Sequence, residues 1–288
     1  MISIIFNPAA GNGNSRVIAQ KAAQYLDKHS IAYEILETKA PGDATRLARA
    51  AAEYADIVVA DGGDGTIREV VQGLVGTSTP LGILPGGRGN DFRRSIGVPN
   101  SVEEAMDLIL NGQTCSMDLM EVNGEICVNI YSVGFDVIVA DYSRKFRIFR
   151  SLSYYVAALY TCFAYRAGRI RIDLDGQILD NKYYLVCFGN GNQYGGGIKI
   201  MPNADNADGF LDVCVIENVS VLQVLRLLPY VTLGKHSRFK DLVHFYKVKE
   251  IRVETPSPVS AQADGDIIDP RTTTYARILP DALKVRVK

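Results

Sequence analysis

The most informative chemistry lies in a glycine-rich run, DGGDGT, at residues 61–66. It follows the apolar residues 57–60, which predict a buried parallel strand, and it precedes a helical pattern over residues 66–75. Glycine lets backbone N–H groups come close to an anion, and the N-terminus of a helix adds a partial positive charge. Asp64 would repel a bare phosphate unless a metal ion or a substrate hydroxyl lay beside it. The run therefore predicts phosphoryl transfer rather than passive anion binding.

Two further loops follow predicted strands. One covers residues 7–13 (NPAAGNG) and the other covers residues 84–92 (LPGGRGNDF). The first holds only the start of a dinucleotide-binding fingerprint, because Arg16 stands where the last glycine belongs, and no GK[ST] of a Walker A loop follows. By itself it fits a plain turn as well as a phosphate contact. Ligands bind at the carboxyl ends of parallel strands, so three such loops at one sheet edge predict a nucleotide phosphate cradle.

Carboxylates recur in two loops of the second part of the chain. In residues 195–212 (GGGIKIMPNADNADGFLD), Asp205 and Asp208 stand three positions apart. They could share a divalent cation with nearby carbonyl oxygens, or they could be two solvated turn residues. Residues 262–266 (QADGD) could form an ordinary turn, or they could place a carboxylate in a cleft.

The elements that must position these loops differ between the two parts of the chain. Strands predicted over residues 2–6, 31–37, 57–60 and 81–84 alternate with helices over 16–27, 44–54, 66–75 and 102–110. Ser101 and Glu104 have the spacing of a capping box for the last of these helices. This rhythm predicts an open parallel sheet with helices on both faces.

After about residue 118 the pattern becomes one of short segments rich in β-formers. They cover residues 126–131, 169–174, 183–188, 211–217, 249–254 and 276–278, and residues 283–287 alternate like an edge strand. Asn123-Gly124 and Asp175-Gly176 are hairpin signals. Helices are predicted over residues 151–165 and, after a capping Ser220, over 221–228. We expect a mainly antiparallel β domain with inserted helices.

Composition narrows the class of protein. The chain has 288 residues, is 47% hydrophobic and has a net charge of −1, so we expect one large or two ordinary packed domains and no nucleic-acid partner. Five widely spaced cysteines favour buried thiols in a reducing compartment over a disulfide framework or zinc site. No signal peptide is visible, and the longest apolar stretch, residues 152–165, is too short to cross a bilayer. We therefore expect a cytoplasmic protein that at most rests on a membrane.

One local charge pattern bears on that membrane question. Residues 144–171 contain seven basic side chains and no acidic one. Such a run fits a solvated surface, or a patch that faces anionic lipid headgroups.

The motifs together resemble those of the bacterial diacylglycerol kinase-like soluble lipid kinases, which share a catalytic domain with diacylglycerol and sphingosine kinases and are distantly related to NAD kinases. Residues 62–66 match the shared nucleotide motif, and residues 7–11 and 86–92 resemble the family's two other loops. Residues 195–212 match GGGxxxxPxAxxxDGxLD, a pattern of the lipid-kinase branch. The match covers nearly the whole chain.

The resemblance implies a fold class of α/β plus all-β. An open parallel α/β nucleotide-binding domain would cover residues 1–120, and an antiparallel β-sandwich would cover 121–280. A last strand, 281–288, would return to the first domain, and the active site would lie in the cleft between the domains.

The resemblance also implies roles for individual residues. Asp64 would organise Mg²⁺ and the phosphates, and Asp266 would be the general base for the lipid hydroxyl. A structural Mg²⁺ would be held by Asp205, Asp208 and the carbonyl oxygen of Phe210. The residues implied to bind ATP are Asn7, Pro8, Ala9, Ala10, Gly11, Thr38, Gly62, Gly63, Asp64, Gly65, Thr66, Glu69 and Arg88.

Two positions depart from the family pattern. Asp266 stands where relatives usually have Glu, so its carboxylate is one methylene shorter, and a base must come within hydrogen-bond reach of its proton. The cleft could close further, Asp64 could act as the base, or activity could be low. Arg88 stands where many relatives have Thr or Ser, and a guanidinium can clamp phosphate oxygens in a bidentate way.

The expected function is ATP- and Mg²⁺-dependent phosphorylation of a lipid hydroxyl, with diacylglycerol as the default acceptor and phosphatidic acid as its product. The alternatives are an NAD kinase-like enzyme with a soluble acceptor and a catalytically weak nucleotide-binding regulatory protein. Peripheral contact with an anionic membrane is expected, and a homodimer is compatible with the sequence. The acyl cleft could be lined by six apolar side chains that ordinary core packing explains equally well: Tyr154, Tyr155, Leu159, Phe163, Leu225 and Leu228.

Overall fold

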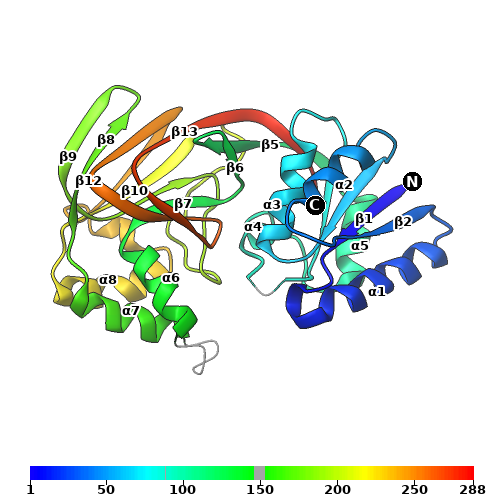
Figure 1. Cartoon of the computed structure of the whole chain (residues 1–288), viewed down its shortest axis with the longest axis horizontal. Coiled ribbons are helices and arrows are strands. Elements are labelled where there is room, and N and C mark those ends of the chain that lie inside the picture. Colours follow the sequence, from blue (N-terminus) through cyan, green and yellow to red (C-terminus); the bar gives the residue numbers. More distant parts are fainter. Residues whose placement is uncertain (88, 146–152) are drawn as a thin grey trace. The chain divides into compact units, whose positions relative to one another are not determined.

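The computed structural model describes residues 1–87, 89–145 and 153–288 (Figure 1). Its contacts divide the chain into two compact units. The first comprises residues 1–119 together with 280–288, and the second comprises residues 120–279. Two strands, β5 (Gln113–Val122) and β13 (Asp266–Val287), contribute residues to both units.

The first unit is built on a parallel sheet with the strand order β4-β3-β1-β2. The strands are β1 (Ile2–Phe6), β2 (Tyr33–Glu37), β3 (Ile57–Asp61) and β4 (Leu81–Leu84). Near its end, β13 lies parallel to β4, with Val285 opposite Leu81. Because helices cover the sheet, β1 and β4 are buried along their whole length, as parallel strands usually are.

Five helices accompany this sheet. They are α1 (Asn14–Lys28), α2 (Asp43–Ala51), α3 (Asp64–Leu74), the short α4 (Asp91–Ser95) and α5 (Val102–Asn111). Helices α1 and α5 share one core with the sheet, where Leu26 and Ile109 pack with Val59. The predicted alternation of strands and helices is therefore confirmed, although α2 ends three residues earlier than expected and α4 was not predicted.

The second unit is an antiparallel β-sandwich. Its strands are β6 (Glu125–Cys127), β7 (Ile130–Gly134), β8 (Gly168–Leu174), β9 (Gln177–Gly189), β10 (Leu211–Glu217), β11 (Val243–Val248), β12 (Glu250–Ala263) and the first part of β13. Strand β9 pairs with both β7 and β8, and β12 also pairs with both. Apolar side chains such as Ile172, Phe188 and Val253 fill the space that these strands enclose.

Three helices contribute to a second core in this unit. They are α6 (Phe135–Lys145), α7 (Ser153–Ala164) and α8 (Val221–Thr232). Val139 of α6, Ala157 of α7 and Leu227 of α8 share this core with Cys187 and Cys214 of the sheet. In the described part of the chain, no helix is both long enough and apolar enough to cross a bilayer.

Both hairpin signals are confirmed. Asn123-Gly124 joins β5 to β6, and Asp175-Gly176 joins β8 to β9, with positive φ at all four residues. The strand predicted over residues 126–131 is instead two strands. Its interruption has a physical cause, because the amides of Val128 and Asn129 donate to the Asp264 carboxylate rather than to a neighbouring strand.

The capping box predicted for Ser101 and Glu104 at the start of α5 is only half formed. Ser101 accepts a hydrogen bond from the Glu104 amide as expected, but its hydroxyl donates to Glu103. The complete, reciprocal capping box is found at the start of α8, between Ser220 and Gln223.

Candidate active site

The three glycine-rich loops start from neighbouring strands of the first unit. Phe6 of β1 lies opposite Asp61 of β3, and Asp61 lies opposite Leu84 of β4. Because the strands are parallel, the loops that follow them leave the same edge of the sheet. The pairing of β1, β3 and β4 therefore brings the three loops to one edge of the sheet, as predicted.

Backbone contacts between the loops explain the glycines. A Cβ atom added at Gly87 would lie 2.4 Å from the Cα of Gly63, so no larger residue fits where the second and third loops touch. A Cβ added at Gly11, whose φ is +59°, would lie 2.4 Å from the carbonyl oxygen of Gly86. The first and third loops therefore touch as well, and all three form one packed cluster.

Side chains lock the first loop to the second. The side-chain amide nitrogen of Asn7 donates to the Thr66 hydroxyl across 3.3 Å, and its side-chain oxygen, Oδ1, accepts from the Ala9 backbone amide across 3.0 Å. Gly62 is packed against this threonine, since a Cβ there would lie 2.5 Å from Thr66 Cβ.

Helices α1 and α3 begin in this cluster. Neither has a side-chain cap among the described residues, and their N-cap positions are Gly13 and Gly63. The first N–H groups of a helix have no partner within the helix and favour an anion. A Cβ added at Gly65 would meet nothing within 4 Å in the described part of the chain, so the start of α3 is open to a ligand.

Asp64 joins the second loop to the third. Its Oδ1 atom accepts from the Asp91 amide across 2.9 Å, at the start of α4, and a Cβ at Gly89 would lie 2.4 Å from its Oδ2 atom. Asp64 is partly exposed at the loop cluster.

Asp61 is a residue of this cluster that sequence reasoning assigned no role. It is fully buried at the end of β3, and Ser15 of α1 donates to its Oδ1 atom across 3.0 Å. Its Oδ2 atom has no hydrogen-bond partner among the residues that the structure describes. Burial raises the pKa of Asp61 to about 7, while the Ser15 hydroxyl and the Ala19 amide oppose the rise.

Two other residues predicted to bind ATP, Thr38 and Glu69, have different surroundings. Thr38 follows β2, and its amide donates to the carbonyl oxygen of Phe6, which places it near the same sheet edge. The Glu69 carboxylate accepts from the Ala44 amide across 3.2 Å, so it holds the start of α2 against α3. An ATP contact of Glu69 stays a prediction, and Arg88 lies outside the described residues.

The predicted general base belongs to the second unit. Asp266 is exposed at the start of β13, after the two-residue turn Asp264-Gly265. The Asp264 carboxylate anchors this turn by accepting from the amides of Val128, Asn129 and Ile130 at 2.9 to 3.2 Å. Sequence reasoning missed this anchoring role, for which the Asp-Gly turn signal was the available clue.

Residues 195–212 of the second unit, here called the acidic loop, lie beside a cation that the sequence did not suggest. The Lys247 ammonium of β11 contacts the Asp208 carboxylate and lies 3.5 Å from Oδ2 of Asp212. Asp205 and Asp208 also accept from the Ala207 and Phe210 amides within their own loop.

The predicted metal site stays a prediction, and the Lys247 ammonium occupies part of it in this structure. The described residues contain no group of three His, Cys, Asp or Glu side chains arranged to hold a metal. A divalent ion at Asp205, Asp208 and the Phe210 carbonyl would have to displace the ammonium group of Lys247.

Comparison with known proteins identifies the family. A model of the diacylglycerol kinase catalytic domain matches residues 1–122, and a model of the YegS C-terminal NAD kinase beta sandwich-like domain matches residues 129–287. A diacylglycerol kinase of Mycobacterium tuberculosis is 33% identical over 99% of this chain and 94% of the relative. The chain belongs to the diacylglycerol kinase family.

Further members support this assignment of the whole chain. A Bacillus subtilis diacylglycerol kinase is 29% identical over 91% of this chain and 88% of the relative. The crystal structure of a putative diacylglycerol kinase from Bacillus anthracis superimposes with a TM-score of 0.82, at 27% identity, over 100% of this chain and 95% of that one. The protein is a kinase, and its relatives place it in a lipid kinase family.

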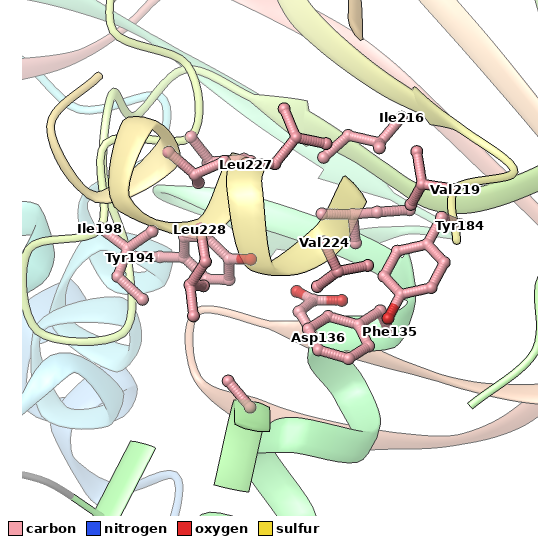
Figure 2. A pocket seen from close by; sticks show the side chains of 14 residues that line it. Phe135, Asp136, Tyr184, Tyr194, Ile198, Ile216, Val219, Val224, Leu227 and Leu228 are labelled. Carbon is pink, nitrogen blue, oxygen red and sulfur yellow. The ribbon is translucent and has the colours of Figure 1, made fainter. Parts of the chain in front are cut away.

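In this kinase, the second unit contains an apolar cavity between its sheet and helix α8 (Figure 2). Its walls come from α6, α8 and strands β9 and β10, with Phe135, Leu185, Ile216 and Leu227 among the lining residues. The cavity volume is about 60 Å³.

One buried acid lines this cavity. Asp136 is 2% exposed, and Figure 2 shows its carboxyl group among apolar side chains beneath α8. Ser132 donates to its Oδ2 atom, and its Oδ1 atom has no partner in the described part of the chain. Burial raises the pKa of Asp136 to about 6.

Two residues of the basic run, for which a solvated surface and a lipid-facing patch were both considered, have acidic partners from elsewhere in the chain. Arg169 forms two hydrogen bonds with Asp180, and Arg171 lies 3.7 Å from Glu254. Arg166 donates to carbonyl oxygens at the end of α7. The side chains of the other four basic residues of the run lie outside those that the structure describes, as do those of Tyr154 and Tyr155.

Proposed function

We propose that this protein is an ATP- and Mg²⁺-dependent lipid kinase that transfers the γ-phosphoryl group to a lipid hydroxyl, with diacylglycerol as the acceptor and phosphatidic acid as the product. The observation that carries the proposal is the packed cluster of three glycine-rich loops, from which α1 and α3 start without side-chain caps among the described residues. Because the chain belongs to the diacylglycerol kinase family, we propose that this cluster binds ATP for phosphoryl transfer to diacylglycerol.

In this proposal the loops position ATP. The amides at the start of α3 would hold phosphate oxygens, and the open space at Gly65 would leave room for them. Mg²⁺ bound with ATP would neutralise charge that develops on the transferred phosphoryl group. Asp64 would orient the nucleotide through its carboxylate while it keeps the second and third loops together.

Asp266 would accept the proton of the lipid hydroxyl. Phosphoryl transfer asks the protein mainly for positioning and charge stabilisation, and a carboxylate that orients the acceptor hydroxyl completes that requirement. The Asp264 turn supports this role, because three backbone amides fix the conformation of the segment that presents Asp266.

The apolar cavity is the proposed inner end of the acyl-chain site. Its present volume is too small for an acyl chain, so binding would require α8 to move away from the sheet. Pro229 interrupts the hydrogen bonding of α8, which lowers the cost of such a movement.

Helices α7 and α8 provide the proposed membrane contact. Large apolar side chains on them remain exposed, among them Tyr160 (51%), Phe163 (60%) and Leu222 (78%). The opposite faces of the same helices pack in the core around the cavity. Insertion of the exposed side chains into a lipid surface would bring the cavity next to its substrate, so we propose peripheral binding at the inner face of the membrane.

The first test is transfer of radiolabelled phosphate from ATP to a panel of lipids in anionic mixed micelles, with NAD as a soluble acceptor alongside. We expect label in diacylglycerol, and a loss of about 100- to 1000-fold in the Asp64→Asn variant, whose amide oxygen can still accept from Asp91. Label in NAD alone would replace the lipid-kinase proposal with the NAD kinase-like one. ATP binding without any labelled acceptor would favour a regulatory protein.

A matched pair of tryptophan variants tests the acyl-chain site. Leu227 lines the cavity, so Leu227→Trp is expected to raise KM for the lipid at least tenfold and leave ATP binding unchanged. Leu222 lies on the same helix with its side chain 78% exposed, so Leu222→Trp is expected to retain lipid binding. Equal KM values in the two variants would remove the cavity from the proposal.

A further inference from the structure

Asp61 is the one carboxyl group at the loop cluster that is completely shielded from solvent. It follows the apolar strand β3, and it directly precedes the glycines of the second loop. A carboxyl group in this place is costly when it is charged, because burial removes the water that would solvate it. Its presence beneath a predicted triphosphate site therefore needs a reason.

Contacts connect Asp61 to all three loops. The first loop begins at Asn7, whose backbone N–H group donates to the backbone carbonyl oxygen of Asp61 across 3.1 Å. The second loop continues from Asp61 itself. In the third loop, Gly86 packs so closely that an added Cβ would lie 1.9 Å from Oδ1 of Asp61.

The hydroxyl of Ser15 links the same carboxyl group to α1. It lies 3.0 Å from Oδ1 and 3.1 Å from the backbone carbonyl oxygen of Asp61. Ser15 is itself fully buried in the first turn of that helix. Any change at the Asp61 carboxyl group therefore reaches the starts of α1 and α3, where the phosphates are proposed to bind.

The charged side chains at the starts of α1 and α3 have partners other than Asp61. Arg16 of α1 pairs with Glu37, and Asp64 of α3 accepts from the Asp91 amide. Among the described residues, no ion pair involves Asp61, and the influences on its pKa are burial, the Ser15 hydroxyl and the Ala19 amide. An ionised Asp61 would thus add a negative charge beneath the proposed triphosphate site, without an ion-pair partner among the described residues.

We propose that Asp61 is a positioning residue for the nucleotide: its neutral carboxyl group keeps the three loops in the packing that receives ATP, and its ionised form opposes ATP. This inference rests on the proposed use of the loops for ATP. Binding and protonation are then linked, because a ligand that disfavours the ionised form raises the affinity of Asp61 for a proton, and the proton raises the affinity for ATP by the same factor.

The test is the dissociation constant for ATP, in the presence of Mg²⁺, at pH values from about 5.5 to about 8.5. The folded-state pKa of Asp61 is about 7, so the ionised form appears in the upper half of this range. We expect the wild-type protein to lose about tenfold in affinity across the range, relative to Asp61→Asn, whose side chain stays neutral. ATP also titrates near neutral pH, and the difference between the two proteins removes that contribution.

A second variant keeps the proposal testable if Asp61→Asn fails to fold. Ser15→Ala removes a hydrogen bond that favours the ionised form, so the loss of affinity should move to higher pH. A purely structural role of Asp61 would lower affinity or stability in these variants without moving the midpoint. In steady-state kinetics, the pH-dependent change should appear in KM for ATP and leave kcat unchanged.

The outcomes separate this inference from the proposed function. Parallel pH profiles for the wild-type protein and Asp61→Asn, or an unmoved midpoint in Ser15→Ala, would overturn the role of Asp61 while ATP binding stands. Absence of ATP binding by all three proteins at every pH would instead contradict the proposed use of the loops.

Discussion

The glycine-loop cluster of the first unit and the acidic loop of the second unit satisfy their charged groups in opposite ways. In the acidic loop, Asp205 and Asp208 accept from their own backbone, and the ammonium of Lys247 lies beside Asp208 and Asp212. In the loop cluster, Asp61 has a hydroxyl partner but forms no ion pair within the described residues. The acidic loop thus has a cation beside its carboxylates, whereas the loop cluster presents two helix starts without side-chain caps among the described residues.

This difference teaches how a ligand site can be told from a structural loop. Glycines and aspartates occur in both segments, so composition does not separate them. The separation comes from the balance of donors and acceptors, because helix starts without side-chain caps and a buried acid give a loop a reason to bind an anion, together with a proton or a cation.

The largest expected effect concerns Asp61 of the loop cluster and the way the free energy of unfolding changes with pH. The pKa of Asp61 rises from 3.8 to about 7 on folding, so between these values the folded state holds a proton that the unfolded state has lost. The contribution of Asp61 to stability therefore falls as pH rises from about 4 to about 7 and is constant above that range. The outer limit is about 4 kcal/mol for a shift of about three units.

The measurement is the free energy of unfolding of the wild-type protein and of Asp61→Asn in urea at several pH values. We expect Asp61→Asn to gain stability relative to the wild-type protein over this range. If the difference between the two proteins does not change with pH, Asp61 titrates normally in the folded state, and the contrast with the acidic loop is lost.

A smaller effect is expected from filling the contact between the loops. In Gly86→Ala, the new methyl group would meet Oδ1 of Asp61 and the hydroxyl of Ser15, so we expect a loss of about 2 to 3 kcal/mol of stability and weaker ATP binding. Gly65→Ala is the matched control, because its Cβ would meet nothing within 4 Å among the described residues. It should keep its stability within about 0.5 kcal/mol.

Thermal and urea unfolding of the two alanine variants decide this point. Equal stability of Gly86→Ala and Gly65→Ala would mean that the third loop moves freely away from Asp61. The loops would then not form the packed cluster on which the comparison depends.

The smallest effect is expected in the acidic loop. Lys247→Met keeps the length of the side chain and removes the ammonium, so Asp208 and Asp212 lose their cation. We expect a loss of about 1 kcal/mol, because the Lys247 side chain is 43% exposed and water screens the ion pair. Mg²⁺ should restore this loss by binding the vacated carboxylates, whereas the wild-type protein should respond little.

Melting temperatures with and without Mg²⁺ provide the readout for both proteins. Stabilisation of the wild-type protein by Mg²⁺ that disappears in Asp208→Asn would contradict the expected competition. It would also support the structural metal site implied by the resemblance.

Much of the first unit could be predicted from the sequence. Its strands are continuous apolar runs between clear helical patterns, and β1 and β4 occupy the predicted residues. The second unit was harder to predict, because α6 contains the β-branched run Val137-Ile138-Val139, which gives no helical signal of its own. Strands β12 and β13 run through prolines that interrupt the expected alternation, and their pairing shifts register between Glu254 and Val259.

The candidate site was also predicted only in part from the sequence. Motif spacing located the loops, and the parallel register brings them to one edge of the sheet. The roles of single side chains depend on partners distant in sequence: Glu69 is held by the start of α2, and Lys247 reaches Asp208 from 39 residues away. Asp61 was overlooked because it ends an apolar strand, and its burial becomes visible only when α1 and the third loop cover it.

The long strand β13 has a consequence for biosynthesis. Its last part lies beside β4 at Val285, and Arg286 donates to the carbonyl oxygens of Ile109 and Leu110 at the end of α5. The ribosome makes these residues only after the whole second unit. The first unit therefore emerges first but lacks an edge strand and the contact of Arg286 with α5 until translation reaches the end of β13, so the unit made first is the last to be completed.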